Sequence, residues 1–174
     1  MFINYTLNTM RMSDNVKIIP EGYHSINPYL VVRNADRAIE FYKKAFDAEE
    51  HFRMHGPNGK HIMHAELKIG DSVFMLTEES PDMKALSPVS IGGSPVSLYV
   101  YVKDVDSVFN QAVDEGATAL HPVKDQFYGD RSGYLKDPFG HLWSIATHQK
   151  DLSPDELRKA AEAFLEEMSK TKAP

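Results

Sequence analysis

The sequence predicts an α+β fold: two βαβββ modules pair to form a curved mixed sheet with a concave cavity, and a further helix follows at the C-terminus. The main observation is an internal repeat. A shift of 70 residues places Val32 on Val102 and Gly70 on Gly140, and such self-similarity is typical of repeated structural units. Residues 81–95 are rich in Ser, Pro and Gly and separate the two copies as a linker would. Because each copy alone is small and has one apolar sheet face to cover, we expect the two to pack together.

The first half of the chain has the pattern of one module. Residues 1–22 lack a clear period and are interpreted as an N-terminal arm, and residues 23–80 form the first predicted module. Within it, Asn34 is a good N-cap residue for a helix that ends near Asp47. Strands are predicted on both sides of this helix, at residues 25–32, 49–54, 61–69 and 72–77.

The second module, residues 96–150, repeats the same order. Asp104 is the predicted N-cap of its helix, and Gly116 the residue that ends it. The last two strands flank an Asp-Pro-Phe-Gly turn, because Pro138 fixes one backbone torsion angle and Gly140 allows a positive φ. The other predicted strands are residues 96–102 and 117–123.

Residues 151–174 are predicted to form a C-terminal helix. Ser153 and Glu156 have the spacing of a capping box, and Pro154 suits the first helical position. An apolar stripe runs along the helix and consists of Leu157, Ala160, Ala161, Phe164, Leu165 and Met168. This stripe either docks on the helix's own domain or covers a dimer interface, and the sequence leaves both alternatives open.

The composition is that of an ordinary globular protein and excludes several classes of function. The chain has 174 residues, of which 42% are hydrophobic and 25% charged. It has no cysteine, which excludes disulfides, thiolate zinc sites and cysteine nucleophiles. With a net charge of −6 and no Lys/Arg cluster, it is not expected to bind nucleic acid. No apolar run approaches the ~20 residues of a membrane span, and no signal peptide is recognisable, so we expect a cytoplasmic protein without a membrane partner.

Short motifs along the repeat point to a known family. They are the helix start NADRAIEFY, the stretch MHAE, the run DQFYGDR, the turn DPFGH and the ending IATH, at residues 34–42, 63–66, 125–131, 137–141 and 145–148. With the paired modules, they resemble the vicinal oxygen chelate superfamily, which includes glyoxalase I, bleomycin-resistance proteins and extradiol dioxygenases, and its PhnB-like branch in particular. The resemblance covers about residues 24–150. It implies the fold, whereas activity must still be argued from the site.

Enzymes of this superfamily usually hold a divalent metal with His, Gln or Glu ligands from the first and last strands of each module. The resemblance places those positions near Asn27, Ser97, Met75 and Ser144. None of these side chains is a good ligand for a hard or borderline divalent ion. The resemblance therefore implies the fold without the usual metal site, and no cofactor is expected.

A different ligand set has the right chemistry for a divalent metal: His64, Glu66 and His148. His64 and Glu66 lie at a spacing of two on one strand face, and His148 shares a face with Ser144. The competing interpretation is that His64 and Glu66 hydrogen-bond each other or line a polar cavity, with His148 at a strand end in solvent.

The concave walls are predicted to bind a small molecule, because aromatic walls with a few convergent polar groups are typical of such pockets. Arg131 could clamp a carboxylate or phosphate of the ligand, or form a surface ion pair with Asp130 or a Glu. The complete set of predicted ligand-binding residues is Asn27, Tyr29, His64, Glu66, Met75, Ser97, Tyr99, Tyr128, Arg131, Ser144 and His148.

The sequence thus favours a glyoxalase/bleomycin-resistance-like (PhnB-like) protein that binds a small molecule in the concave cavity without the usual metal. The alternative is a divalent-metal-dependent lyase, isomerase or dioxygenase of glyoxalase type, and whether the chain is an enzyme stays open. A methyltransferase role is disfavoured, since no Gly-rich nucleotide loop follows a strand. The exposed module edges, and the pairing of modules across chains in this superfamily, favour a homodimer.

Overall fold

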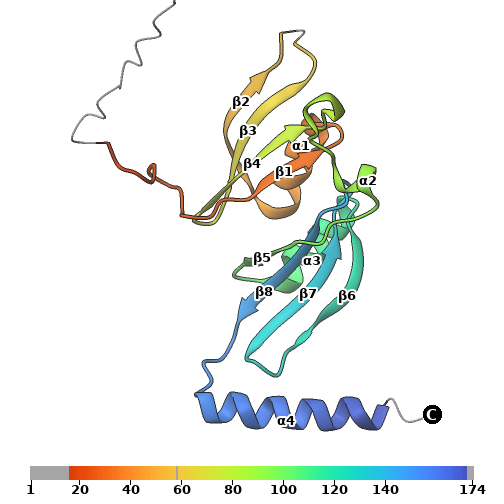
Figure 1. Cartoon of the computed structure of the whole chain (residues 1–174). Coiled ribbons are helices and arrows are strands. Elements are labelled where there is room, and N and C mark those ends of the chain that lie inside the picture. Colours follow the sequence, from red (N-terminus) through yellow and green to blue (C-terminus); the bar gives the residue numbers. More distant parts are fainter. Residues whose placement is uncertain (1–15, 58, 172–174) are drawn as a thin grey trace, which may run out of the picture.

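The computed structural model describes residues 16–57 and 59–171 and has the predicted α+β architecture (Figure 1). Two separate four-stranded mixed sheets, each with one helix on one face, make up the body. The order of the first sheet is β1-β4-β3-β2, and that of the second is β5-β8-β7-β6. In both, the first strand of the module runs parallel to the last, and the other neighbours are antiparallel.

The element bounds repeat from one module to the next. The first module contains β1 (Tyr29–Val32), α1 (Ala35–Phe46), β2 (Glu49–His55), β3 (Ile62–Ile69) and β4 (Ser72–Glu78). The second contains β5 (Ser97–Tyr101), α3 (Val105–Asp114), β6 (Thr118–Asp125), β7 (Asp130–Lys136) and β8 (Leu142–His148). Between them lie the 3-10 turn η1 (Pro81–Met83) and α2 (Pro88–Ile91), and α4 (Pro154–Thr171) follows the second module.

The first strand starts later than its sequence pattern indicates. The side chain of Asn27 accepts a hydrogen bond from the backbone N–H of His24 at 3.1 Å and donates one to the carbonyl of His24 at 2.6 Å. This local turn occupies the residues before Pro28, so β1 begins only at Tyr29. Of the predicted N-terminal arm, residues 1–15 lie outside the described part of the chain.

Side chains at the predicted caps fix both module helices. Asn34 accepts a hydrogen bond from the Arg37 N–H, and Asp104 accepts one from the Ser107 N–H, each at 3.1 Å. In the first module, β4 adds a second cap, because the Glu78 carboxylate accepts hydrogen bonds from two backbone N–H groups at the start of α1, both at 2.7 Å. These contacts satisfy N–H groups that have no partner within the helix.

One continuous hydrophobic core joins the modules. Trp143 of β8 is 3% exposed, and its ring lies 4.8 Å from that of Phe46 and 5.6 Å from that of Tyr42, both on α1. The helices α1 and α3 also contact each other. The helix-covered faces of both sheets therefore point toward a common interior (Figure 1).

A buried carboxylate links the modules within this core. Asp137, in the turn before β8, accepts hydrogen bonds from the Tyr42 hydroxyl at 2.8 Å and from Trp143 Nε1 at 3.0 Å. Its other oxygen accepts the backbone N–H groups of Phe139 and His141, both at 2.9 Å. Asp137 is 3% exposed, so the charge is buried with a full set of donors.

The segment predicted as a linker is attached to the first module. One oxygen of the Glu79 carboxylate accepts hydrogen bonds from the backbone N–H and the hydroxyl of Ser87, at 2.7 and 2.6 Å, and from the Ser90 hydroxyl. The other oxygen contacts Arg33 Nε at 3.2 Å. The Ser87 and Ser90 hydroxyls lower the pKa of Glu79 to about 2. Contacts of Ser87 and Ser90 with Glu79 therefore hold this connection against the first module.

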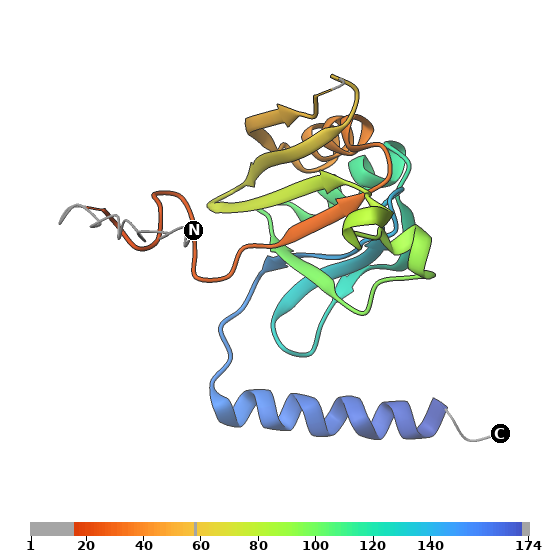
Figure 2. The same cartoon turned by 45° about the horizontal axis from the view of Figure 1, so that its top comes forward.

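The C-terminal helix α4 lies apart from the two sheets (Figures 1 and 2). The predicted capping box is present, with the Ser153 N–H and hydroxyl donating to the Glu156 carboxylate at 2.9 and 2.7 Å. The ring of Phe164 stacks on Phe127 at 4.9 Å, which is a contact with the helix's own module. Leu165, on the same helix, is 64% exposed. Among the described helices, none is long and apolar enough to span a membrane.

Candidate functional site

The face of each sheet that points away from α1 and α3 is called here the open face. Strand register places eight of the predicted site residues on these faces: Tyr29, His64, Glu66 and Met75 in the first module, and Ser97, Tyr99, Ser144 and His148 in the second. The alternate residues of the same strands point to the core. The predicted site residues therefore gather in two groups, one on each sheet.

On the first open face, His64 connects Tyr29 to Glu66. Its Nδ1 lies 3.1 Å from the Tyr29 hydroxyl, and its Nε2 lies 3.1 Å from a Glu66 carboxylate oxygen. A hydrogen bond from Tyr23 and a weaker contribution of His64 lower the pKa of Glu66, and the same bond raises the pKa of Tyr23 to about 12. The interpretation that His64 and Glu66 hydrogen-bond each other is thus the one the structure has.

On the second open face, three side chains contact a buried carboxylate, and a fourth contacts one of these three. Asp130, at the start of β7, is 4% exposed. One of its oxygens accepts hydrogen bonds from the hydroxyls of Tyr99 and Tyr101, at 3.0 and 2.9 Å. The other lies 2.7 Å from His148 Nδ1, and Nε2 of the same ring lies 2.9 Å from the carboxylate of Asp151. We call these five residues the Asp130 cluster.

The electrostatics of the Asp130 cluster follow from burial and hydrogen bonding. Burial acts to raise the pKa of Asp130, but hydrogen bonds from His148, Tyr101 and Tyr99 outweigh it, and the pKa is lowered. Burial, with hydrogen bonds to Tyr128 and Asp130, raises the pKa of Tyr99. Hydrogen bonds to Asp130 and Asp151 raise the pKa of His148. The cluster thus favours an ionised carboxylate, neutral tyrosines and a protonated imidazole.

A cavity of about 450 Å³ lies where β1, β3 and β4 meet the β2–β3 loop and the turn η1. Its apolar lining includes Tyr29, Ile62, Met63 and Met83, and its polar lining consists of His61, Thr77, Glu78, Glu79 and Ser80. The volume is within the range of small-molecule sites, which extends from about 300 to 1,000 Å³. Of the predicted ligand-binding residues, Tyr29 lines this cavity.

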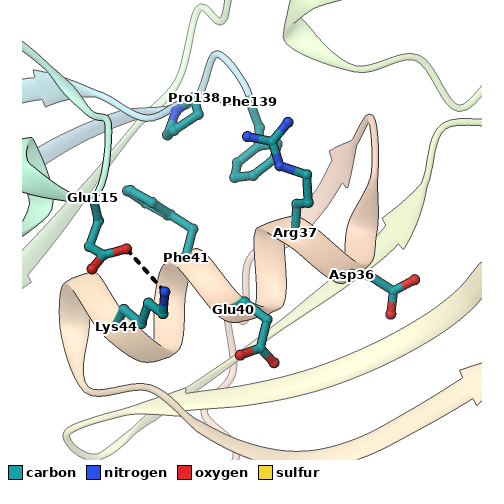
Figure 3. Close-up of a pocket in the computed structure, with 8 residues that line it drawn as sticks. All are labelled: Asp36, Arg37, Glu40, Phe41, Lys44, Glu115, Pro138 and Phe139. Carbon is teal, nitrogen blue, oxygen red and sulfur yellow. Dashed lines mark ion pairs between the residues drawn. The ribbon is translucent and has the colours of Figure 1, made fainter.

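Two further cavities lie between the modules. One of about 330 Å³ separates the β3–β4 turn from β5 and is lined by Phe74, Tyr99, Tyr101 and Trp143 among others. The other, of about 340 Å³, lies on the helix side and is lined by eight residues, all labelled in Figure 3. Lys44 of α1 and Glu115 form an ion pair at 3.5 Å across its side (Figure 3). Its charged lining has both signs, which gives it no selectivity for an ion of either charge.

The donor set does not fit the metal centre that the superfamily usually has. Asn27 is engaged in the turn with His24, and Met75, Ser97 and Ser144 offer a thioether and two hydroxyls. Within the described ranges, no group of three or more His, Asp or Glu side chains is arranged to hold a metal ion.

The non-standard ligand set is also not assembled. His64 and Glu66 belong to the first open face, whereas His148 belongs to the Asp130 cluster of the second. Both ring nitrogens of His64 and of His148 are engaged in hydrogen bonds.

Arg131 is not where the prediction placed it. As the neighbour of Asp130 on β7, it points to the opposite, helix-covered face. Its guanidinium pairs with Asp106 of α3 at 2.7 and 2.8 Å and with Asp125 of β6 at 2.9 Å. Its ion-pair partners are therefore neither Asp130 nor a Glu, and Arg131 links α3 to the second sheet in place of the predicted ligand clamp.

Three members of the Asp130 cluster were missed by the sequence analysis: Tyr101, Asp130 and Asp151. A signal for two of them was present, because Tyr101 shares strand parity with Tyr99, and Asp130 pairs directly with His148 across β7 and β8. Tyr128, which was predicted, lies in the loop before β7 and acts on the cluster by helping to raise the pKa of Tyr99. Asp151 lies beyond the last strand, where no periodicity indicates its position.

Comparison with known proteins identifies the family. A family model described as the Glyoxalase/Bleomycin resistance protein/Dioxygenase superfamily matches residues 22–145. The chain belongs to this superfamily. The matched region holds both modules up to β8 and leaves out α4.

Relatives of this superfamily member cover most of its length. An uncharacterized protein of Mycobacterium tuberculosis is 43% identical over 139 residues, which is 78% of this chain and 81% of the relative. Among solved structures, a gene product of Arabidopsis thaliana is 27% identical with a TM-score of 0.56, over 71% of this chain and 98% of that one. TioX from Micromonospora sp. ML1 is 25% identical with a TM-score of 0.55, over 75% and 100% of the two chains. A PhnB protein of Bacillus cereus, at 22% identity and a TM-score of 0.55 over 71% and 99%, shares the fold.

Proposed function

We propose that this protein binds a small organic molecule and that it does so without the divalent metal usual in its superfamily. The observation that carries the proposal is the 450 Å³ cavity beside the first sheet, with Tyr29, Met63 and Met83 in its wall. Aromatic and thioether side chains around a few polar groups suit an uncharged or amphipathic ligand body. The bleomycin-resistance proteins in the name of the superfamily are consistent with a binding role.

A homodimer forms part of this proposal. Large side chains of the first open face are about half exposed, namely Tyr29, Phe52 and Met54. Exposed apolar surface of this kind is typical of interaction sites. A second copy facing the first sheet would shield these side chains and close the cavity. Sedimentation equilibrium of the full chain measures the mass that distinguishes a dimer from a monomer.

The metal-dependent alternative makes a separate prediction. A lyase, isomerase or dioxygenase of glyoxalase type would carry stoichiometric metal after purification without chelator, and would lose it on His64→Ala. We expect the purified protein to contain less than stoichiometric zinc, nickel, manganese and iron by elemental analysis. Stoichiometric metal that depends on His64 would favour the enzyme over the binding protein.

The binding proposal is tested by a thermal-shift screen of small organic compounds, with affinities of the hits measured by calorimetry. Met63→Ala removes apolar wall and should weaken the binding of a hit by about three- to tenfold, as expected for a partly buried thioether chain. Leu120→Ala is the control, because Leu120 is a similarly exposed apolar side chain on β6 that lies neither in the cavity wall nor on the proposed interface. Equal affinities of the two variants would contradict a ligand in this cavity.

A further inference from the structure

The Asp130 cluster of the second module contains a histidine, His148, whose two ring nitrogens contact two carboxylates, one buried and one exposed. Asp130 is buried, and its contact with His148 Nδ1 at 2.7 Å fixes the orientation of the imidazole ring. The other ring nitrogen, Nε2, lies 2.9 Å from Asp151. Since carboxylates accept hydrogen bonds at both nitrogens, both N–H groups of the ring donate.

The two carboxylates differ in how firmly they are held. Asp130 has donors on both oxygens, from His148, Tyr99 and Tyr101. Asp151 is fully exposed, and the side chain of His148 is half exposed. An ion pair at an exposed position contributes little to stability, because water competes for both partners. Asp151 therefore occupies the outer nitrogen of His148 without being fixed there.

We propose that His148 Nε2 is the binding point for the carboxylate of a small organic ligand, with Asp151 as the internal group that the ligand displaces. The position accepts a carboxylate oxygen, because one is present there in the structure. Tyr99, Tyr101 and Tyr128 expose ring surface around the same cluster, and their exposed fractions lie between 37% and 61%. A flat ligand body beside these rings would gain contact area at little conformational cost.

The arrangement supplies orientation as well as charge. Asp130 holds the Nδ1–H side of the ring, so the direction of Nε2 is set before a ligand arrives. The charged and titratable groups that face His148 are Asp130 of β7, Asp151 after β8, and the tyrosines of β5 and of the loop before β7. Neutralisation of Asp130 by His148 leaves Asp151 as the competitor of an incoming carboxylate.

This inference rests on the proposed function only in treating the chain as a small-molecule binder, since it concerns the second module and not the cavity beside the first. The probe is benzoate, with benzyl alcohol as the matched compound that has the ring but no carboxylate. Nuclear magnetic resonance titration of the full chain, observing the histidine side-chain nitrogens, reports both affinity and place. The His148 signals are assigned from the spectrum of a His148→Phe variant.

The decisive variant is Asp151→Asn, because it removes the internal competitor from a fully exposed position and leaves the fold intact. We expect it to bind benzoate about two- to fivefold more tightly than the unmodified protein, which matches the strength of an exposed ion pair. His148→Phe should weaken benzoate binding at least about fivefold, through loss of a charge-assisted hydrogen bond. Should that variant fail to fold, the comparison of Asp151→Asn with the unmodified protein decides alone.

Asp155→Asn is the matched control for charge, because Asp155 is an exposed carboxylate on α4 that pairs with Arg158 rather than with His148. It should leave the affinity for benzoate unchanged. Equal gains from Asp151→Asn and Asp155→Asn, or equal binding of benzyl alcohol and benzoate, would overturn the inference. Shifts at His64 in place of His148 would also overturn it, whereas failure of the cavity variant Met63→Ala to affect its ligand would count only against the proposed function.

Discussion

Asp137 shows at the scale of one residue how the turn before β8 stabilises the fold. Four donors from both modules converge on its buried carboxylate. Asp137→Asn replaces an acceptor oxygen with an N–H group that faces donors, so we expect the free energy of unfolding to fall by about 2–3 kcal/mol. Tyr42→Phe removes one donor and should cost about 1 kcal/mol. Chemical denaturation measures both, and equal losses would show that the carboxylate itself is unimportant.

The His148 side chain should make stability depend on pH. Its pKa in the folded protein is raised above the ordinary value of 6.5 by Asp130 and Asp151. The stabilisation is therefore complete below pH 6.5 and is lost as the pH rises through the raised pKa. Denaturation midpoints of the unmodified protein and of His148→Gln, measured between about pH 6 and 9, should converge as the pH rises. Parallel curves would contradict this linkage.

Helix α3 lies so close to β7 that there is no room for an added methyl group at Gly133. A Cβ atom at Gly133 would lie 2.6 Å from the ring of Phe109 and 2.9 Å from Val123. Gly133→Ala should therefore destabilise the protein by about 1–3 kcal/mol, as overpacking does. Gly56→Ala is the control, since its Cβ would meet Met63 at an ordinary 3.4 Å. Similar midpoints of thermal unfolding for the two variants would contradict the close packing.

Elements were predictable from sequence where local chemistry decides them. The caps Asn34 and Asp104, the capping box at Ser153 and the turn at Gly140 follow from short motifs, and the structure contains all of them. The start of β1 was not predictable in the same way. The residues before Pro28 have a sequence that also suits a strand, and only the hydrogen bonds of Asn27 with His24 show that they form a turn.

The candidate site was predictable only in part, because the sequence pattern of a strand gives the face of each side chain but not its partners. Strand parity fixes the face of a side chain once one residue is placed, and it assigned Tyr29, Glu66, Tyr99 and His148 to open faces. It carries no information on partners from other elements. Arg131 was therefore predicted to bind a ligand, whereas in the structure its guanidinium pairs with Asp106 of α3.

At the scale of the whole molecule, the single tryptophan reports on both modules together. Trp143 lies against rings of α1 and against Phe74 of β4, so its surroundings exist only while the modules are packed. We expect its fluorescence and the far-ultraviolet circular dichroism to follow one denaturation curve, as one cooperative unit requires. Two separated transitions would mean that the modules unfold independently.

The position of α4 has a consequence for the motions of the chain. The shared core contains no residue of this helix, and the stacking of Phe164 on Phe127 is its ring contact with the body. Amide protons of α4 should therefore exchange with solvent deuterium when this helix alone opens. Those of Tyr42 and Ile145 should exchange only when the whole protein unfolds. A protein fused to the C-terminus would then move together with α4 relative to the two sheets and leave their packing unchanged.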